Sequence, residues 1–241
     1  MISPMHKTAV VLVASGLSRR FGRHDKMLAN LGGKPLVEHA AKAITSLHPI
    51  TRVAVCPANR PAIGERLIDR FVIAVNKKPK DGLGYSIALG AQVALQFKPE
   101  AIMVCMGDMP FVEPWLLDVL TRRLAEGDAD IVHAGASQSP HPPTVFGRNC
   151  FERLAGLDGD DGAKSLMRAA DLRVVAFSAP GPLLLDIDTR DDLDLAARQL
   201  AIRTRHYAHQ PSGDETGAGH ATAEMPMSRP AEVWQSRAAA G

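Results

Sequence analysis

Two kinds of segment follow one another along the chain. Short runs rich in Val, Ile and Leu predict buried strands, because a strand covered on both faces has no polar side. Between them, longer segments carry apolar residues at every third or fourth position, the period of a helix with one buried face. The predicted strands are Thr8–Val13, Arg52–Cys56, Phe71–Val75, Ala101–Met106, Asp130–Ala134, Thr144–Phe146, Leu172–Phe177 and Leu183–Ile187.

Four segments have the helical period. Pro114 takes a favourable first-turn position in one of them, and Ser86 is placed to cap another. Strands that alternate with helices predict a mostly parallel sheet with helices on both faces. We therefore expect an α/β protein with a single three-layer, Rossmann-like domain. The predicted helices are Pro35–Leu47, Ile87–Phe97, Pro114–Ala125 and Arg190–Arg203.

The composition changes sharply after Arg203. Residues 204–241 contain one Val and no Leu, Ile or Phe, whereas Gly, Ala, Ser, Pro, Glu and His dominate. Such a segment buries too little apolar surface to offset the entropy lost on ordering. We expect a domain over residues 1–203 and a disordered C-terminal tail over residues 204–241. A short docking motif around Val233 and Trp234 is the alternative for part of this tail.

The overall composition is typical of a soluble globular protein. Of the 241 residues, 46% are hydrophobic, and the net charge of +2 argues against a nucleic-acid partner that depends on many phosphate contacts. Cys56, Cys105 and Cys150 have no zinc-site or disulfide spacing, so we expect reduced, buried thiols. The chain has neither a bilayer-spanning apolar stretch nor a signal peptide, so we expect a cytoplasmic protein without a membrane partner.

The strand Thr8–Val13 leads into a loop that combines glycines with cations. This loop, Ala14–Lys26, contains two glycines, three arginines and Lys26 itself. Glycines let backbone N–H groups approach a ligand closely, and the cations neutralise its charge. The spacing matches neither a Walker A loop nor a dinucleotide Gly-x-Gly-x-x-Gly motif. The loop therefore predicts a different kind of anion site, in which we interpret His24 as a solvated residue.

A second candidate site begins where the strand Ala101–Met106 runs into Gly107-Asp108-Met109-Pro110. Parallel α/β sheets bind ligands at the carboxyl ends of their strands. A carboxylate at that position suits Mg²⁺ beside a triphosphate, because Mg²⁺ favours one or two carboxylates together with phosphate oxygens and water. The alternative for Asp108 alone is a carboxylate that caps the following turn.

A third candidate is the acidic stretch at the end of the predicted strand Leu183–Ile187. Strand alternation places Asp186 and Asp188 on one face, where a second carboxylate near Asp108 would complete a metal site. Thr189 can also cap the next helix, with Asp192 at its third position in a capping-box arrangement. Taken alone, the stretch fits helix capping and metal binding equally well.

Together these stretches resemble the motifs of the molybdenum-cofactor-type nucleotidyltransferases, a family of NTP transferase domains. The first loop is similar to Leu-Ala-Ala/Gly-Gly-x-Ser-x-Arg-x-Gly followed by Lys. Asp186–Leu193 is similar to the closing motif, in which the second Asp contacts the metal. Val75–Ile87 and Ser139–Lys164 look like the base-side and acceptor-side segments. The motifs follow the family order over roughly residues 7–200.

The resemblance implies a role for individual positions. The implied catalytic residues are Arg20, Lys26 and Asp108. The implied ligands of a Mg²⁺ cofactor are Asp108 and Asp188. The implied acceptor contacts are His141, Pro142 and Lys164. The implied nucleotide contacts are Ala14, Ser15, Gly16, Ser18, Arg20, Lys26, Asn76, Gly82 and Ser86.

Within this family the chain is most similar to the molybdenum cofactor cytidylyltransferases, which mature cofactors for enzymes of the xanthine dehydrogenase type. Ser15 stands where that branch has Ala and the guanylyl-transferring branch has Gly. Two departures concern the acceptor side. Ser139-Pro140 replaces Arg-Gly before His-Pro, and Lys164 replaces an Arg, which removes a bidentate fork for phosphate.

The implied reaction transfers CMP from CTP to the phosphate of molybdopterin and releases pyrophosphate. The implied partners are CTP, molybdopterin and a molybdoenzyme of the xanthine dehydrogenase type. Three alternatives stay open: GMP transfer, a sugar-phosphate acceptor, and a non-catalytic accessory protein that binds and hands on the cofactor. The presence of Arg20, Lys26, Asp108 and Asp188 together argues against the accessory protein.

Overall fold

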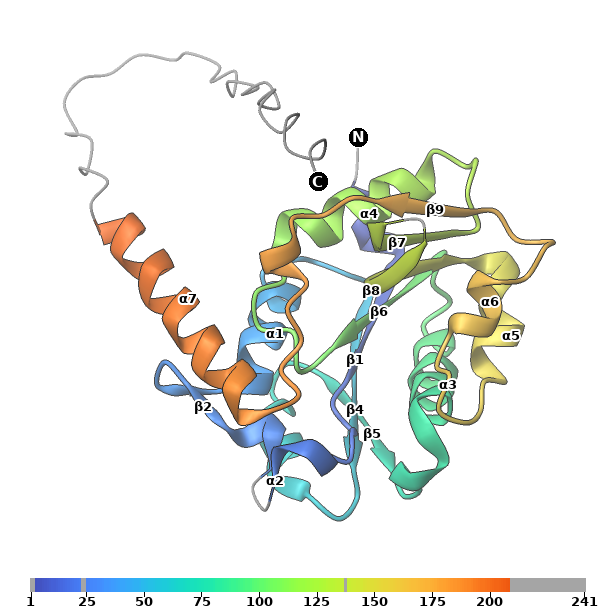
Figure 1. Cartoon of the computed structure of the whole chain (residues 1–241). Coiled ribbons are helices and arrows are strands. Elements are labelled where there is room, and N and C mark those ends of the chain that lie inside the picture. Colours follow the sequence, from blue (N-terminus) through green and yellow to red (C-terminus); the bar gives the residue numbers. More distant parts are fainter. Residues whose placement is uncertain (1–2, 23–24, 137, 209–241) are drawn as a thin grey trace, which may run out of the picture.

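Seven strands form the central sheet of the protein, which we describe from a computed structural model at residues 3–22, 25–136 and 138–208 (Figure 1). Strand β8 is antiparallel to its neighbours β6 and β7, and the other adjacent pairs are parallel. The prediction of a mostly parallel sheet is therefore confirmed. Across the sheet, the strands are β5 (Val72–Asn76), β4 (Thr51–Pro57), β1 (Thr8–Val13), β6 (Ala101–Met106), β8 (Ser139–Gly147), β7 (Ile131–Ala136) and β9 (Val174–Phe177).

Helices cover both faces of this sheet, which explains why its central strands are apolar throughout. Val11 of β1 lies opposite Val53 of β4 and Val104 of β6, and all three are buried. Helices α1 and α4 pack on one face, and α3, α5 and α6 pack on the other (Figure 1). The helices are α1 (Leu36–Thr45), α2 (Pro61–Glu65), α3 (Gly82–Leu95), α4 (Pro114–Ala125), α5 (Phe151–Ala155), α6 (Lys164–Met167) and α7 (Arg190–Ala208).

The expected cap of α3 is wrong. The helix begins at Gly82, with Asp81 in the N-cap position, and Ser86 lies one turn inside it. The Ser86 hydroxyl donates to the Gly82 carbonyl oxygen at 3.2 Å, so it is satisfied within the helix. The glycines at positions 82 and 84 argue against a helix that starts at residue 82, because glycine is unfavourable in a helix unless tertiary contacts compensate.

The predicted strand Leu183–Ile187 is also wrong. A short 3-10 turn at Gly181–Leu183 is followed by irregular chain that crosses the end of β6. There the Ile187 N–H donates to the carbonyl oxygen of Asp108 at 3.0 Å, and the Ile187 side chain is buried. The alternation of apolar and polar residues therefore reflects burial of a loop, and it does not reflect pairing in the sheet.

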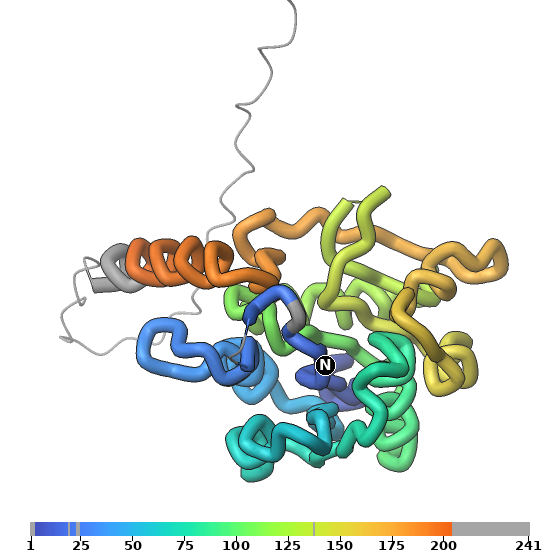
Figure 2. Tube along the Cα trace, turned by 60° about the horizontal axis from the view of Figure 1, so that its bottom comes forward, coloured from blue at the N-terminus to red at the C-terminus, as the bar shows by residue number. Residues whose placement is uncertain are grey.

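A small core separate from the two sheet faces joins α7 to the rest of the protein. We call it the third core, and its buried members are Phe21, Leu31, Leu36, Phe111, Ile187 and Ala196. Helix α7 lies beside the hairpin of β2 (Asn30–Leu31) and β3 (Lys34–Pro35), as Figure 2 shows. The approach is close, since a Cβ on Gly32 would lie 2.4 Å from the Leu200 side chain.

The boundary predicted at residue 203 falls inside α7, which continues to Ala208. Residues 209–241, the larger part of the predicted tail, lie outside the described residues, as do Arg23 and His24. The three cysteines are free and buried, as expected. In the described part of the chain, no helix is both long and apolar enough to cross a membrane.

Candidate functional site

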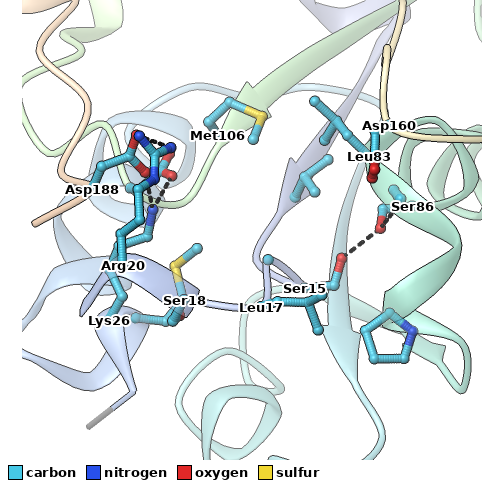
Figure 3. A pocket seen from close by; sticks show the side chains of 16 residues that line it. Ser15, Leu17, Ser18, Arg20, Lys26, Leu83, Ser86, Met106, Asp160 and Asp188 are labelled. Carbon is cyan, nitrogen blue, oxygen red and sulfur yellow. Dashed lines mark hydrogen bonds and ion pairs between the residues drawn. The ribbon is translucent and has the colours of Figure 1, made fainter. Parts of the chain in front are cut away.

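A cavity of about 300 Å³ opens at the carboxyl ends of β1 and β6. The loop after β1, the start of α3 and the acidic residues after β6 and before α7 line it. Figure 3 shows Lys26 and Asp188 on one side of this cavity and Ser86 and Asp160 on the other. The sheet thus brings together the first loop, Asp108 and Asp188, which are far apart in the sequence.

Lys26 lies at the centre of a charged cluster. Its Nζ atom donates to Asp108 Oδ2 at 2.7 Å and to Asp188 Oδ1 at 3.0 Å. The Arg20 guanidinium donates to the other oxygen of Asp188 at 2.6 Å. The Lys26 side chain is only 7% exposed, whereas that of Arg20 is 73% exposed at the mouth of the cavity. Two cations and two carboxylates therefore meet within hydrogen-bond distance at one side of the cavity.

Burial and attraction act in opposite directions on Lys26. Burial alone would lower its pKa, but the attraction and hydrogen bonds of Asp108 and Asp188 outweigh burial and raise the pKa above its ordinary value. Lys26 is therefore a buried ammonium whose charge depends on both carboxylates.

Backbone contacts hold the two carboxylates in place. Gly107 follows β6 and donates its N–H to the Val13 carbonyl oxygen at 2.9 Å, which anchors the turn that carries Asp108. Asp188 follows Ile187, whose N–H bonds to the carbonyl of Asp108. Asp188 is thereby tied to Asp108 through the backbone, although no ladder of strand pairs connects them.

The predicted cap of the last helix is present. One oxygen of Asp192 accepts the backbone N–H of Asp188 at 3.0 Å and that of Thr189 at 2.7 Å. The Thr189 hydroxyl accepts the N–H of Asp192 at 3.2 Å. Hydrogen bonds from Thr189 hold the pKa of Asp192 below its ordinary value. The capping and metal-binding interpretations are therefore compatible, because the cap uses Asp192 and leaves the carboxylate of Asp188 available for a metal.

The other side of the cavity is a buried polar network. Ser15 donates its hydroxyl to Ser86 at 2.8 Å, and Asn76 donates its side-chain amide to the same oxygen at 3.0 Å. The side-chain oxygen of Asn76 accepts the backbone N–H of Lys78 at 2.7 Å, which sets the orientation of the amide. Ser15, Asn76 and Ser86 are each at most 3% exposed. This network fixes the first loop against the start of α3.

Arg60 is a contributor that the sequence did not single out. Its guanidinium donates to the Gly16 carbonyl oxygen at 2.6 Å and to the Asp25 carboxylate at 3.1 Å. It therefore joins the two ends of the first loop. Arg60 precedes Pro61 in a connecting loop and belongs to no recognisable motif, so only the tertiary structure reveals its role.

The start of α3 packs closely on a second glycine-rich loop. The Gly84 N–H donates to the Gly159 carbonyl oxygen at 2.7 Å. A Cβ on Gly82 would lie 2.3 Å from the Gly159 backbone, and one on Gly84 would lie 2.4 Å from the carbonyl oxygen of Asp158. This packing brings Asp160 into the lining of the cavity, a residue to which sequence analysis assigned no role.

Some predicted site residues do not line this cavity. Ala14 and Asn76 are buried beside it and support its wall. On the acceptor side, His141 and Pro142 lie on β8, and Lys164 is exposed at the start of α6. The His141 ring contacts the Pro142 carbonyl oxygen at 2.9 Å. The structure therefore places most of the residues expected to contact the nucleotide around this cavity. The residues expected to contact the acceptor lie outside it.

To hold a divalent metal, Asp108 and Asp188 would need further ligands from outside the protein. Among the described residues, no group of three or more His, Cys, Asp and Glu side chains is arranged for a metal. The two carboxylates do converge, since both contact one ammonium. Two carboxylates completed by phosphate oxygens and water are a usual environment for Mg²⁺. The donor set therefore fits a metal that arrives with a polyphosphate.

Known proteins resemble this chain in sequence and in fold. Residues 9–174 match the family described as "MobA-like NTP transferase domain". The chain is 26% identical to "Purine catabolism protein PucB" of Bacillus subtilis, over 79% of this chain and 96% of that protein. It is 26% identical to "Probable molybdenum cofactor guanylyltransferase" of Mycobacterium avium, over 80% of this chain and 96% of that protein.

Solved structures share the fold. The manganese complex of Rv0371c from Mycobacterium tuberculosis aligns with a TM-score of 0.63, at 21% identity, over 79% of this chain and 97% of that one. At that identity the likeness concerns the fold alone, and it agrees with the three-layer architecture observed above.

Proposed function

Since the chain belongs to the MobA-like NTP transferase domain family and is therefore a nucleotidyltransferase, we propose that it transfers CMP from CTP to the phosphate of molybdopterin with the help of Mg²⁺. The observation that carries this proposal is the cluster of Lys26, Asp108 and Asp188 beside the glycine-containing first loop. It combines the cations that a triphosphate needs with the carboxylates that its metal needs.

In the proposed reaction, an oxygen of the acceptor phosphate forms a bond to the α-phosphorus of CTP. The bond from that phosphorus to the oxygen bridging to the β-phosphate breaks, and pyrophosphate leaves with the electron pair. The nucleophile is already an anion, so the protein needs no general base. Catalysis then consists of positioning and charge stabilisation.

The residues divide these tasks. Backbone N–H groups of the first loop cradle phosphate, and Lys26 and Arg20 stabilise charge on the α-phosphate and on the leaving pyrophosphate. Asp108 and Asp188 would hold Mg²⁺, which when bound supplies further charge stabilisation to the phosphates. Lys26 bridges both carboxylates, and its ammonium would be free to contact phosphate when these carboxylates hold the metal.

The choice of CTP over GTP rests on Ser15. This residue is 1% exposed and lines the cavity, and its hydroxyl is tied to Ser86. A side chain at this position narrows the pocket so that it fits the smaller pyrimidine base, whereas glycine would leave room for a purine. The name of the M. avium relative favours GTP instead, which makes GMP transfer the second candidate.

A competition experiment separates the two candidates. The protein is given equal CTP and GTP with molybdopterin and Mg²⁺, and the nucleotidylated product is identified by mass spectrometry. A mismatch of about 2–3 kcal/mol predicts a CMP excess of roughly 30- to 150-fold. Ser15→Gly reduces this ratio, whereas Ser18→Gly, a matched change where the backbone φ is already 54°, alters turnover without altering the ratio.

Each outcome has a clear meaning. Mainly guanylylated product would assign the chain to GMP transfer. If no nucleotide releases pyrophosphate in the presence of molybdopterin, a non-catalytic accessory protein is favoured. If pyrophosphate is released only when a sugar phosphate is supplied, the acceptor is a sugar phosphate.

A further inference from the structure

Helix α7 lies beyond residue 174, where the family match ends, yet it packs next to the charged cluster. We propose that α7 is a positioning element for the phosphate side of the site, by which we mean the charged cluster of Arg20, Lys26, Asp108 and Asp188. Arg190 and Arg203 are the positioning residues through which α7 acts. The inference rests on the proposed function in one respect, namely that the charged cluster is the part of the site that binds phosphate. Its contacts are observed in the structure independently of any substrate.

The first contact joins the start of α7 to the first loop. The Arg190 guanidinium lies over the ring of Phe21, 5.6 Å from its centroid. Phe21 is 2% exposed in the third core and follows Arg20 directly in the chain. The position of the Arg20 backbone is therefore coupled to the seating of α7.

The second contact joins the C-terminal half of α7 to the loop after β6. The Arg203 guanidinium lies over the ring of Phe111, 5.5 Å from its centroid, and also pairs with the carboxylate of Glu113. Phe111 is buried in the third core, three residues after Asp108. Helix α7 therefore contacts the chain next to both sides of the ion cluster.

The third contact concerns Asp188 itself. Ile187 is fully buried in the third core with Ala196 of α7, and the Asp192 cap bonds the backbone N–H of Asp188. Asp188 thus lies between a buried neighbour and a capped helix. Since its side chain is 30% exposed and that of Arg20 is 73% exposed, their own packing constrains them little. The third core beneath them supplies that constraint.

The expected consequence differs between the two sides of the cavity. The network of Ser15, Ser86 and Asn76 belongs to the loop after β1, to α3 and to β5, and the third core includes none of these residues. Loosening α7 therefore disturbs phosphate and metal binding and leaves the network unchanged. A displacement of about 1 Å in a catalytic constellation can cost on the order of 100-fold in rate.

The test uses the full chain with Arg190→Gln and Arg203→Gln, and Arg198→Gln as the control. Arg198 is an exposed arginine on the same helix, so the control makes the same chemical change. We expect each positioning variant to lose about tenfold in kcat, which corresponds to about 1.4 kcal/mol. The half-saturating Mg²⁺ concentration rises several-fold, while the affinity for cytidine stays within twofold. Arg203→Lys partly restores kcat, because an ammonium can also lie over the ring and pair with Glu113.

A merely structural role predicts a different result. Turnover would fall in proportion to the folded fraction, with unchanged Mg²⁺ requirement, and that outcome overturns the proposal. Equal losses in Arg198→Gln overturn it as well. If the wild type proves inactive, the proposed function fails but the inference is still tested by hydrogen–deuterium exchange. Arg203→Gln then accelerates exchange at residues 108–113 relative to Arg198→Gln, and equal exchange in both variants overturns the inference.

Discussion

Lys26 illustrates how one side chain depends on several parts of the chain. Its ammonium is buried, and two carboxylates from distant segments offset the cost of that burial. Removing one partner of a buried ion pair leaves the remaining charges uncompensated, which is more costly than losing the whole pair. Lys26 therefore contributes to stability in the free protein and to phosphate binding in the proposed complex.

We expect Lys26→Ala to lower the free energy of unfolding by up to about 3 kcal/mol at neutral pH, because Asp108 and Asp188 then face each other without their shared cation. Turnover falls, and the affinity for CTP falls more than the affinity for cytidine, because the partner of Lys26 is phosphate. Thermal melting and calorimetric titration with the two ligands measure these effects.

Lys26→Met is the matched variant, since it keeps the aliphatic stem and removes only the charge. Equal weakening of cytidine and CTP binding in either variant would place Lys26 away from the phosphates. A melting temperature equal to that of the wild type would contradict its role as the shared cation.

Among the secondary structure elements, the start of α3 shows how glycine serves a site without contacting its ligand. Gly82 and Gly84 lie where the backbone of residues 158–160 approaches most closely. Their lack of a side chain allows the second loop to approach, and that loop brings Asp160 to the cavity. Glycine is unfavourable inside a helix, so its presence here reflects packing.

Gly84→Ala is expected to push the second loop away, because a Cβ would lie 2.4 Å from the Asp158 carbonyl oxygen. Overpacking of this kind costs about 1–3 kcal/mol. We expect a lower melting temperature and a higher KM for the nucleotide, measured by thermal denaturation and by pyrophosphate release.

Gly64→Ala is the control for helix propensity. Gly64 lies in α2, where a Cβ would make ordinary contacts at 3.7 Å or more. That variant should be as stable as the wild type or slightly more stable, by up to about 1 kcal/mol. If Gly84→Ala behaves in the same way, the close approach seen in the structure does not limit the site.

At the scale of the whole molecule, α7 and the residues after it have different roles. Helix α7 covers the third core through Ala196, whereas residues 209–241 have the composition of a segment that cannot form a core. We expect truncation after Ala208 to leave melting temperature and turnover nearly unchanged. Truncation after Thr189 exposes the third core and lowers both, turnover by more than tenfold.

Thermal melting and pyrophosphate release of the two truncated chains check this expectation. A loss of several degrees on truncation after Ala208 would indicate that the segment 209–241 docks on the domain. Normal turnover after removal of α7 would contradict the positioning role proposed for that helix.

Local sequence determined the elements whose signals are local. The bounds of β1, β6 and α4 follow from their apolar pattern and from Pro114, and the Thr189–Asp192 cap follows from residues three positions apart. These interactions need only neighbouring residues, so the sequence suffices to predict them. The position of a site at the carboxyl ends of the strands follows from the parallel sheet.

Tertiary structure alone decided the contacts between distant segments. The order of strands places Asp108 beside the first loop, and the third core brings Asp188 to Lys26 although Leu183–Ile187 forms no strand. The role of Arg60 likewise depends on how two loops meet. The pattern of apolar and polar residues does not predict such contacts, because they form between residues far apart in the chain. Burial of apolar side chains determines which polar groups come together there.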